Sequence, residues 1–402
     1  MSEPSAPTRD AKSAPRGRIK ERPEDFVVEE IPAYGASGQG DHVFVRFTKT
    51  ERTTIDAVNA IARGLGCDPR AAGFAGMKDK VAVTTQTASL QAPRGVDPHD
   101  LARRACALDL PGIRVHEAKP HPHKIRPGHL AGNRFAIAVR GVPPDRVGDV
   151  TRALDRVASE GVPNAFGAQR YGRERDNVSR ALAWLRPDPA SSGPAGARTP
   201  RDPRVRRLLW SSLQSAIFDA VLAARTENGT WATALEGDLL KLRTSGGLFL
   251  CADVQTDRER AMRGEVSPTG PMVGARMRWP EGAAGQLERW ICAKMLGDDF
   301  DFGTVRRLGE GTRRVLRVWV DDLRYAIEDD PGGHGAPCVR VYFVLPKGAY
   351  ATTVLRAAVD VEGEPAMHDD LEATNAKAKH PSDEVEAGSG RQENEEDESE
   401  DA

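Results

Sequence analysis

Alternating apolar and polar positions predict several strands in the first third of the chain. Residues 26–32 and 42–48 show this pattern and are joined by a glycine-rich turn, GASGQGD. A threonine-rich strand is expected at residues 81–90, with shorter strands at 113–118 and 135–139. We therefore expect this region to be rich in β-sheet.

Apolar residues three and four positions apart predict helices between and after these strands. Residues 53–66 have one apolar face and end in glycines, and in residues 204–224 large apolar side chains recur every four positions. Shorter helices are expected at 100–108, 145–159 and 351–359.

The chain changes in character after Gly172. Residues 187–203 are rich in proline, glycine, serine and arginine and predict a loop. Strand patterns return at residues 314–320 and 338–346. These signals predict a sheet-rich main domain that is interrupted by an insertion.

The folded part is predicted to be α/β, of the α+β type. Both ends of the chain are too polar to bury a core, so we expect them to be disordered. The predicted parts are a leader (1–16), the first part of the main domain (17–172), the insertion (173–303), the second part of the main domain (304–360) and an acidic tail (361–402).

Charge is distributed unevenly along the 402 residues. The net charge is −2, but residues 361–402 hold fifteen acids and three lysines or arginines, so residues 1–360 carry a net charge of +10. A basic body favours a polyanionic partner, most simply a nucleic acid. The alternative is that the tail only aids solubility.

The chain has neither a secretory signal nor an apolar run of the roughly 20 residues that a membrane helix needs. Its five cysteines include no CxxC pair, which argues against a disulfide framework and a zinc knuckle. We expect a reduced, cytoplasmic protein.

The segment AGMKDKVAVTTQ, residues 75–86, holds the most informative chemistry. Asp79 lies between Lys78 and Lys80, shortly after Gly76 and before the threonine-rich strand. Adjacent positive charge favours a carboxylate, and a carboxylate on a rigid turn can act as a nucleophile or base. The residues alone leave open a solvated loop whose acid is simply paired with a lysine.

A basic segment, residues 116–134, holds four histidines, two lysines and two arginines. A metal site is disfavoured because the histidine spacing fits no ligand pattern and prolines interrupt it. A loop that faces phosphates is one interpretation, and a solvated loop is the other.

Six segments, in order, resemble motifs of the TruD family of pseudouridine synthases. The resemblance spans residues 19–356 and departs at Ala165, where the family has an aromatic residue, and at Tyr171, where it has phenylalanine. The segments are IKERPEDFVVEEIP (19–32), AGMKDKVAVTTQ (75–86), AGNRF (131–135), PNAFGAQRYG (163–172), SPTGPMVG (267–274) and FVLPKGAYATTVLR (343–356).

The resemblance implies a mixed, mainly antiparallel catalytic sheet with an inserted α/β domain. It also implies that uridine is isomerised to pseudouridine in tRNA, at uridine 13 of the D arm. Asp79 matches the aspartate that attacks the ribose or assists its opening. We expect a monomer that uses no cofactor or metal, with no membrane and no protein partner.

The resemblance also places residues at the substrate. Asn133 and Phe135 match the pair that supports the aspartate and packs against the target base, although a phenylalanine in a strand can equally belong to the core. Phe343, or its neighbour Tyr342, is expected to supply another aromatic wall. The substrate-binding set is Lys20, Phe26, Lys78, Asn133, Phe135 and Phe343.

Two other functions compete with this one. An RNA-binding protein could keep a basic RNA-binding cleft between the two domains without the chemistry, but the intact Lys78-Asp79 pair speaks against this. A nucleosidase or nuclease could use Asp79, but paired carboxylates or metal ligands are not found near it in the sequence.

Overall fold

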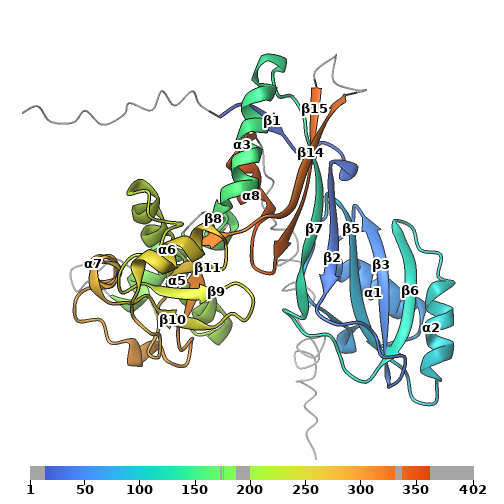
Figure 1. Ribbon diagram of the computed structural model, residues 1–402. Helices are drawn as coiled ribbons and strands as arrows, with labels where there is room; N and C mark the ends of the chain where they lie inside the picture. The colour runs from blue at the N-terminus through green and yellow to red at the C-terminus, as the bar shows by residue number, and fades with distance from the viewer. Residues whose placement is uncertain (1–13, 173, 175, 187–199, 331–336, 363–402) are drawn as a thin grey trace, which may run out of the picture. The chain divides into compact units, whose positions relative to one another are not determined.

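The structure is a computed structural model (Figure 1). The expected tail lies almost entirely outside the described residues, as do most of the expected leader and of the loop at 187–203. The described residues are 14–172, 174, 176–186, 200–330 and 337–362.

An eight-stranded sheet forms the main body, in the order β14-β15-β7-β2-β5-β3-β6, with β4 paired to β5. Within it β2 and β5 run parallel and the other pairs are antiparallel, so the expected mixed, mainly antiparallel sheet is confirmed. The strands are β2 (Phe26–Pro32), β3 (His42–Thr50), β4 (Gly73–Phe74), β5 (Val83–Gln91), β6 (Ile113–His121), β7 (Leu130–Val139), β14 (Asp321–Asp329) and β15 (Pro337–Pro346).

Four helices cover one face of this sheet. Val43, Val45 and Phe47 alternate along β3 and form a core beside α1 (Thr54–Gly64) and α2 (Pro98–Cys106). A second core joins β2, β7 and β15 to α3 (Val147–Glu160) and α8 (Ala351–Arg356). Figure 1 shows α3 and α8 near β14 and β15, and α2 next to β6.

Both cores lie on the same face, as the strand register shows. Lys49 is opposite Thr84, Thr84 is opposite Val28, and Val28 is opposite Phe135. Paired residues project to the same side of a sheet. The buried polar pair Lys49 and Thr84 therefore lies between two apolar cores.

The opposite face is mostly polar, apart from a small buried cluster that includes Phe44, Ile125 and Leu130. Arg46 and Arg134 both form ion pairs with Glu29, and Thr48 bonds to Thr85 and His116. This alternation explains why the strands could be predicted from the sequence.

A second, four-stranded sheet has the order β10-β9-β11-β12. Trp210, Leu213 and Ile217 of the long helix α5 are fully buried in a core that they share with α7. The elements are α4 (Asn177–Leu185), α5 (Pro203–Glu227), β9 (Leu239–Leu242), β10 (Leu248–Leu250), α6 (Val254–Met262), β11 (Val266–Met272), α7 (Gly282–Leu296) and β12 (Thr312–Val315).

Short elements connect and close the two sheets. Two more strand pairs form, β1 with β16 in parallel and β8 with β13 antiparallel. Their bounds, with those of the 3-10 helices, are β1 (Arg16–Arg18), β8 (Val162–Pro163), β13 (Arg317–Val318), β16 (Asp360–Glu362), η1 (Pro23–Asp25), η2 (Pro69–Ala71), η3 (Pro144–Arg146), η4 (Ala168–Tyr171) and η5 (Phe302–Val305).

Strand pairing refines the expected segments. The single strand expected at 314–320 is wrong, because β12 pairs with β11 whereas β13 pairs with β8. β12, which ends at Val315, belongs to the second sheet, whereas Val318 of β13 packs in the core of the main sheet. The sequence patterns also missed α4, α6, α7 and β14. Among the described residues, no helix is long and apolar enough to cross a membrane.

Candidate active site

Asp79 lies in the loop between β4 and β5, on the helix-covered face of the main sheet. Its Oδ2 is 3.0 Å from Nζ of Lys20, and the two side chains are 19% and 9% exposed. Lys20 has a φ of 59°, a left-handed conformation that is unfavourable for a non-glycine residue. The backbone of the N-terminal segment is therefore strained at Lys20, the residue whose ammonium group contacts the Asp79 carboxylate.

Buried polar groups fix the backbone of this loop. Lys49 is fully buried, and its Nζ donates to the carbonyl oxygen of Asp79 at 2.6 Å. The N–H of Lys78 donates to Oγ1 of Thr54 at 2.9 Å, and this hydroxyl donates to Oε1 of Gln86 at 3.0 Å. Helix α1 and strands β3 and β5 therefore all hold the loop in place.

Lys78 is not the lysine that pairs with Asp79. Its Nζ lies 2.7 Å from Oε2 of Glu30, and both side chains are buried, at 7% and 2% exposed. The interpretation that Lys78 supplies the charge beside Asp79 is therefore corrected, because the lysine paired with this carboxylate is Lys20.

Three phenylalanines from separate strands lie together. Phe135 stacks on Phe343 with ring centroids 5.2 Å apart, and its ring meets Phe26 edge-on at 6.2 Å. Nζ of Lys20 lies 4.3 Å from the centroid of Phe26, which connects the aromatic group to Asp79. Phe135 is 7% exposed and belongs to the main core.

The strand register shows whether Phe343 or Tyr342 lies beside Phe135. Phe343 is opposite Phe135, whereas Tyr342 is opposite Ala136. Since successive side chains alternate, Phe343 faces the helix-covered side and Tyr342 the other side.

Unpaired polar atoms surround this loop. Asn133 is two residues before Phe135 and shares its face, but among the described contacts it has no hydrogen bond to Asp79. Its Oδ1 is buried without a partner, as are Oγ1 of Thr84 and Nε2 of Gln86. Buried polar groups are nearly always hydrogen-bonded, so these three exceptions, on the strands β7 and β5 that flank β2, are what a site for a polar ligand would leave.

The N-terminal motif is anchored by a buried ion network. The guanidinium of Arg140 donates to both carboxylate oxygens of Asp25 at 2.8–3.0 Å and to Asp330. These hydrogen bonds, that to Asp25 first, raise the pKa of Arg140. Asp25 thus positions the N-terminal segment that carries Lys20 and Phe26.

The family motif near residue 170 meets the insertion through a buried cluster. The guanidinium of Arg314 lies 4.1 Å from the ring centroid of Phe166, and it donates to Oδ1 of Asn164 at 2.6 Å. The hydroxyl of Tyr171 donates to Asp219. The departure at Tyr171 therefore adds a hydrogen bond, and burial raises the pKa of both Tyr171 and Asp219.

The histidines of the basic segment make separate contacts. Nε2 of His116 bonds to Thr48, His121 packs against Phe44, and Nδ1 of His129 bonds to the hydroxyl of Tyr34. No group of three or more metal-ligating side chains occurs in the part of the chain that the structure describes.

Sequence reasoning missed four residues that build the site: Glu30, Lys49, Thr54 and Arg140. Glu30 and Thr54 stand in or near recognised motifs, but nothing local shows that they hold the loop. A buried lysine in an otherwise apolar strand face, as at Lys49, is the one signal that could have been found.

The sequence profile of the family described as tRNA pseudouridine synthase D (TruD) matches residues 11–182 and 179–358. A protein named tRNA pseudouridine synthase D from Anaeromyxobacter sp. strain Fw109-5 is 43% identical over 343 residues, which is 85% of this chain and 91% of the relative. The chain belongs to the TruD family. It is accordingly a pseudouridine synthase, an isomerase.

Other TruD relatives agree. The protein of that name from Geobacter metallireducens is 39% identical, covering 85% of this chain and 94% of the relative. The protein of that name from Thermus thermophilus is 34% identical, covering 88% and 93%. A crystal structure of a putative TruD protein from Methanosarcina mazei superposes with a TM-score of 0.72 at 22% identity, covering 86% of this chain and 94% of that one, which supports the fold.

Proposed function

We propose that this enzyme converts uridine 13 in the D arm of tRNA to pseudouridine, with Asp79 as the nucleophile. The observation that carries the proposal is the setting of Asp79. Its carboxylate is held by Lys20 at 3.0 Å, on a loop fixed by Lys49 and Thr54. The named relatives support tRNA as the substrate.

The proposed reaction is an exchange of one glycosidic bond for another. Attack of the Asp79 carboxylate on the ribose breaks the bond between C1′ and N1, and the electron pair stays on uracil. The detached base rotates, and its C5 then bonds to C1′ as the aspartate leaves. C5 loses a proton and N1 gains one, so atoms balance and no electrons are consumed.

The surrounding residues have separate roles in this proposal. Lys20 orients the carboxylate and balances its charge, and Lys78 positions the loop through Glu30. Phe26, Phe135 and Phe343 form an apolar wall for an extruded base, while Asn133 supplies a polar edge. With tRNA as its substrate, the enzyme is proposed to act in the cytoplasm.

The decisive experiment is to incubate unmodified tRNA with the enzyme and map pseudouridine at each position. We expect product at uridine 13 with wild type. Asp79→Asn should form less than about a hundredth as much, yet bind tRNA within a few-fold of wild type, because it preserves shape and changes only the reacting group. Greater turnover by this variant would contradict the nucleophile assignment.

The competing functions predict different products. Tight binding of tRNA without pseudouridine would indicate an RNA-binding protein. Release of free uracil or a cut strand would indicate a hydrolase. Product at another position would leave the chemistry in place and refute uridine 13 as the target.

A further inference from the structure

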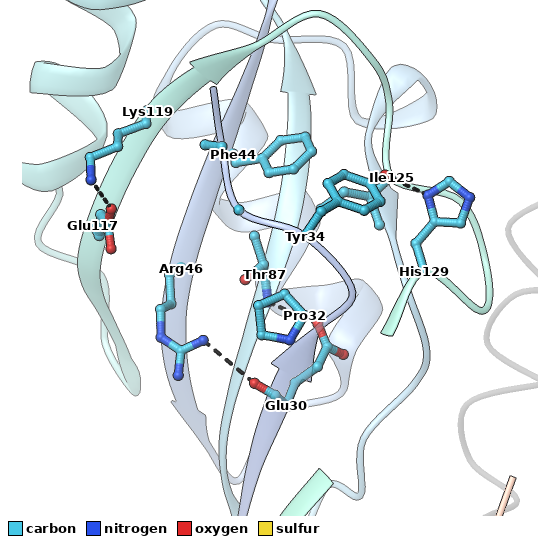
Figure 2. Close-up of a pocket in the computed structure, with 12 residues that line it drawn as sticks. Glu30, Pro32, Tyr34, Phe44, Arg46, Thr87, Glu117, Lys119, Ile125 and His129 are labelled. Atoms are coloured by element: carbon cyan, nitrogen blue, oxygen red, sulfur yellow. Dashed lines mark hydrogen bonds and ion pairs between the residues drawn. The ribbon is translucent and has the colours of Figure 1, made fainter. Parts of the chain in front are cut away.

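A cavity of about 280 Å³ opens on the polar face of the main sheet (Figure 2). Phe44 and Arg46 of β3 line it, and they alternate with Val43 and Val45, which face α1 and α2. Lys49, which contacts the Asp79 carbonyl, shares the face of Val43 and Val45. The cavity is therefore on the opposite face of the sheet from Asp79.

An exposed tyrosine stands at this cavity and is held in place. Tyr34 is 38% exposed, and its hydroxyl bonds to Nδ1 of His129 at 2.6 Å. Its ring stacks on His121 with centroids 5.5 Å apart and lies 6.2 Å from Phe44. A fixed aromatic ring with an open surface can stack a planar ligand while losing little conformational entropy.

The lining also offers polar groups of two kinds. Glu30 lines the cavity with its backbone, and its carbonyl oxygen accepts from Nη1 of Arg46 at 3.5 Å, whereas its carboxylate is buried and bonded to Lys78 and Thr87. A carbonyl oxygen has two lone pairs, so it can also accept from an N–H of a ligand. Arg46 and Lys119 add positive charge, each paired with a carboxylate, of Glu29 and Glu117, and the Lys119 side chain is 58% exposed.

We propose that this cavity binds one unpaired nucleobase of the RNA substrate, a base that carries an amino group. The inference rests on the proposed tRNA substrate and adds a recognition point apart from the target uridine. The base stacks on Tyr34, its N–H edge faces the carbonyl oxygen of Glu30, and the phosphates next to it meet Arg46 and Lys119. This gives the basic segment at residues 116–134, which supplies Lys119 and His129, a role in binding.

The chemistry of the lining distinguishes this ligand from others. The cavity has room for one ring system and not for a helix, while Arg46 and Lys119 can exchange their carboxylate partners for the phosphates of a ligand. Glu30 lines the cavity with its backbone and holds Lys78 with its carboxylate, so one residue joins the cavity to the loop that carries Asp79.

The test measures binding of unmodified tRNA transcripts to Tyr34→Ala, Tyr34→Phe and wild type by filter binding, with pseudouridine mapped in the same samples. Loss of one stacked base weakens binding by about tenfold in Tyr34→Ala. Tyr34→Phe keeps the ring and should bind within about threefold of wild type. Ile327→Ala, which truncates a 56% exposed side chain on β14, is the matched control and should bind as wild type.

A second measurement identifies the nucleotide. Single abasic sites are introduced across the tRNA outside the target uridine, and the affinity of each transcript is compared between wild type and Tyr34→Ala. At one position the abasic site should lower the affinity of wild type about tenfold and leave the affinity of Tyr34→Ala unchanged, because the variant has already lost that contact. The proposal is overturned if, at every position, the abasic site lowers the affinity of both proteins by the same factor.

These outcomes separate the cavity from the proposed function. If wild type makes pseudouridine and Tyr34→Ala binds tRNA equally well, the cavity proposal alone fails. If wild type binds tRNA, depends on Tyr34 and makes no pseudouridine, the proposed function alone fails. Absence of tRNA binding by wild type overturns both.

Discussion

Single residues at this site depend on partners far away in the sequence. Lys20 reaches Asp79 across 59 positions, and Glu30 reaches Lys78 across 48. Each pair places a charge where it would be unfavourable alone, so neither residue can be replaced independently of its partner.

We expect Lys78→Met to lower the free energy of unfolding by about 3–5 kcal/mol, because Glu30 would keep a buried charge without its partner. Urea denaturation at pH 7 measures this loss. The double variant Lys78→Met with Glu30→Leu should recover most of it, since neither charge remains. A single variant as stable as wild type would show that water or another residue already compensates Glu30.

Phe135→Ala is expected to reduce turnover far more than Phe135→Tyr, because only the alanine removes a ring from the proposed base-binding wall. The change also opens a cavity in the core, which costs about 3–5 kcal/mol of stability. Turnover must therefore be measured at low temperature, on protein shown by circular dichroism to be folded. Normal turnover in a folded but less stable Phe135→Ala variant would show that Phe135 only packs in the core and does not bind the base.

At the level of elements, the contact between η4 and α5 joins a family motif to the insertion. Tyr171 from η4 donates to Asp219 of α5, and the N–H of Phe166 donates to the same carboxylate at 3.0 Å. Burial is the largest cause of the raised pKa of Asp219, while these donors oppose it. The stability of this contact should therefore depend on pH.

Tyr171→Phe should destabilise the protein by about 1–3 kcal/mol at pH 7, because a buried carboxylate loses a donor. The loss should shrink as the pH falls toward 4. Removing the donor raises the pKa of Asp219 in the folded protein further above its ordinary value of 3.8. A raised pKa lowers the stability only at a pH at which the carboxyl group is ionised in the unfolded chain, so the loss disappears in acid.

Urea denaturation of wild type and Tyr171→Phe between pH 4.5 and 7.5 measures how the difference in their free energies of unfolding changes with pH. Asp219→Asn with Tyr171→Phe serves as the control, since it has no carboxylate to titrate at this position. A destabilisation by Tyr171→Phe that is constant over this range would contradict the assignment to Asp219.

At the level of the whole molecule, charge is separated between a basic body and an acidic end. Residues 361–402 carry a net charge of −12 against +10 for the rest of the chain. Such a segment competes with phosphates for the same lysines and arginines.

Removal of residues 365–402 should leave catalysis intact and tighten binding to non-cognate RNA at low salt. The difference should fade at physiological ionic strength, where the Debye length is about 8 Å. Binding curves of full-length and truncated protein at two salt concentrations measure it. A full-length variant with amides in place of the tail acids should behave as the truncated protein, whereas superimposable low-salt curves would leave the tail without a role in RNA binding.

Most strands and helices of the main sheet, the order of the family motifs and the position of Asp79 in its loop could be predicted from the amino-acid pattern alone. These features are local, because an alternating or four-residue spacing and a motif can be recognised within a few positions. The same local patterns failed at residues 314–320, where one apolar run is divided between two pairings.

The contacts between side chains from distant segments could be identified only in the folded structure. Lys20 rather than Lys78 pairs with Asp79, Phe343 rather than Tyr342 faces Phe135, and Lys49 holds the loop that carries Asp79. Each of these contacts joins segments that are distant along the chain. The register of strands brought together by folding sets the face on which a side chain projects, and a shift of one residue would reverse it.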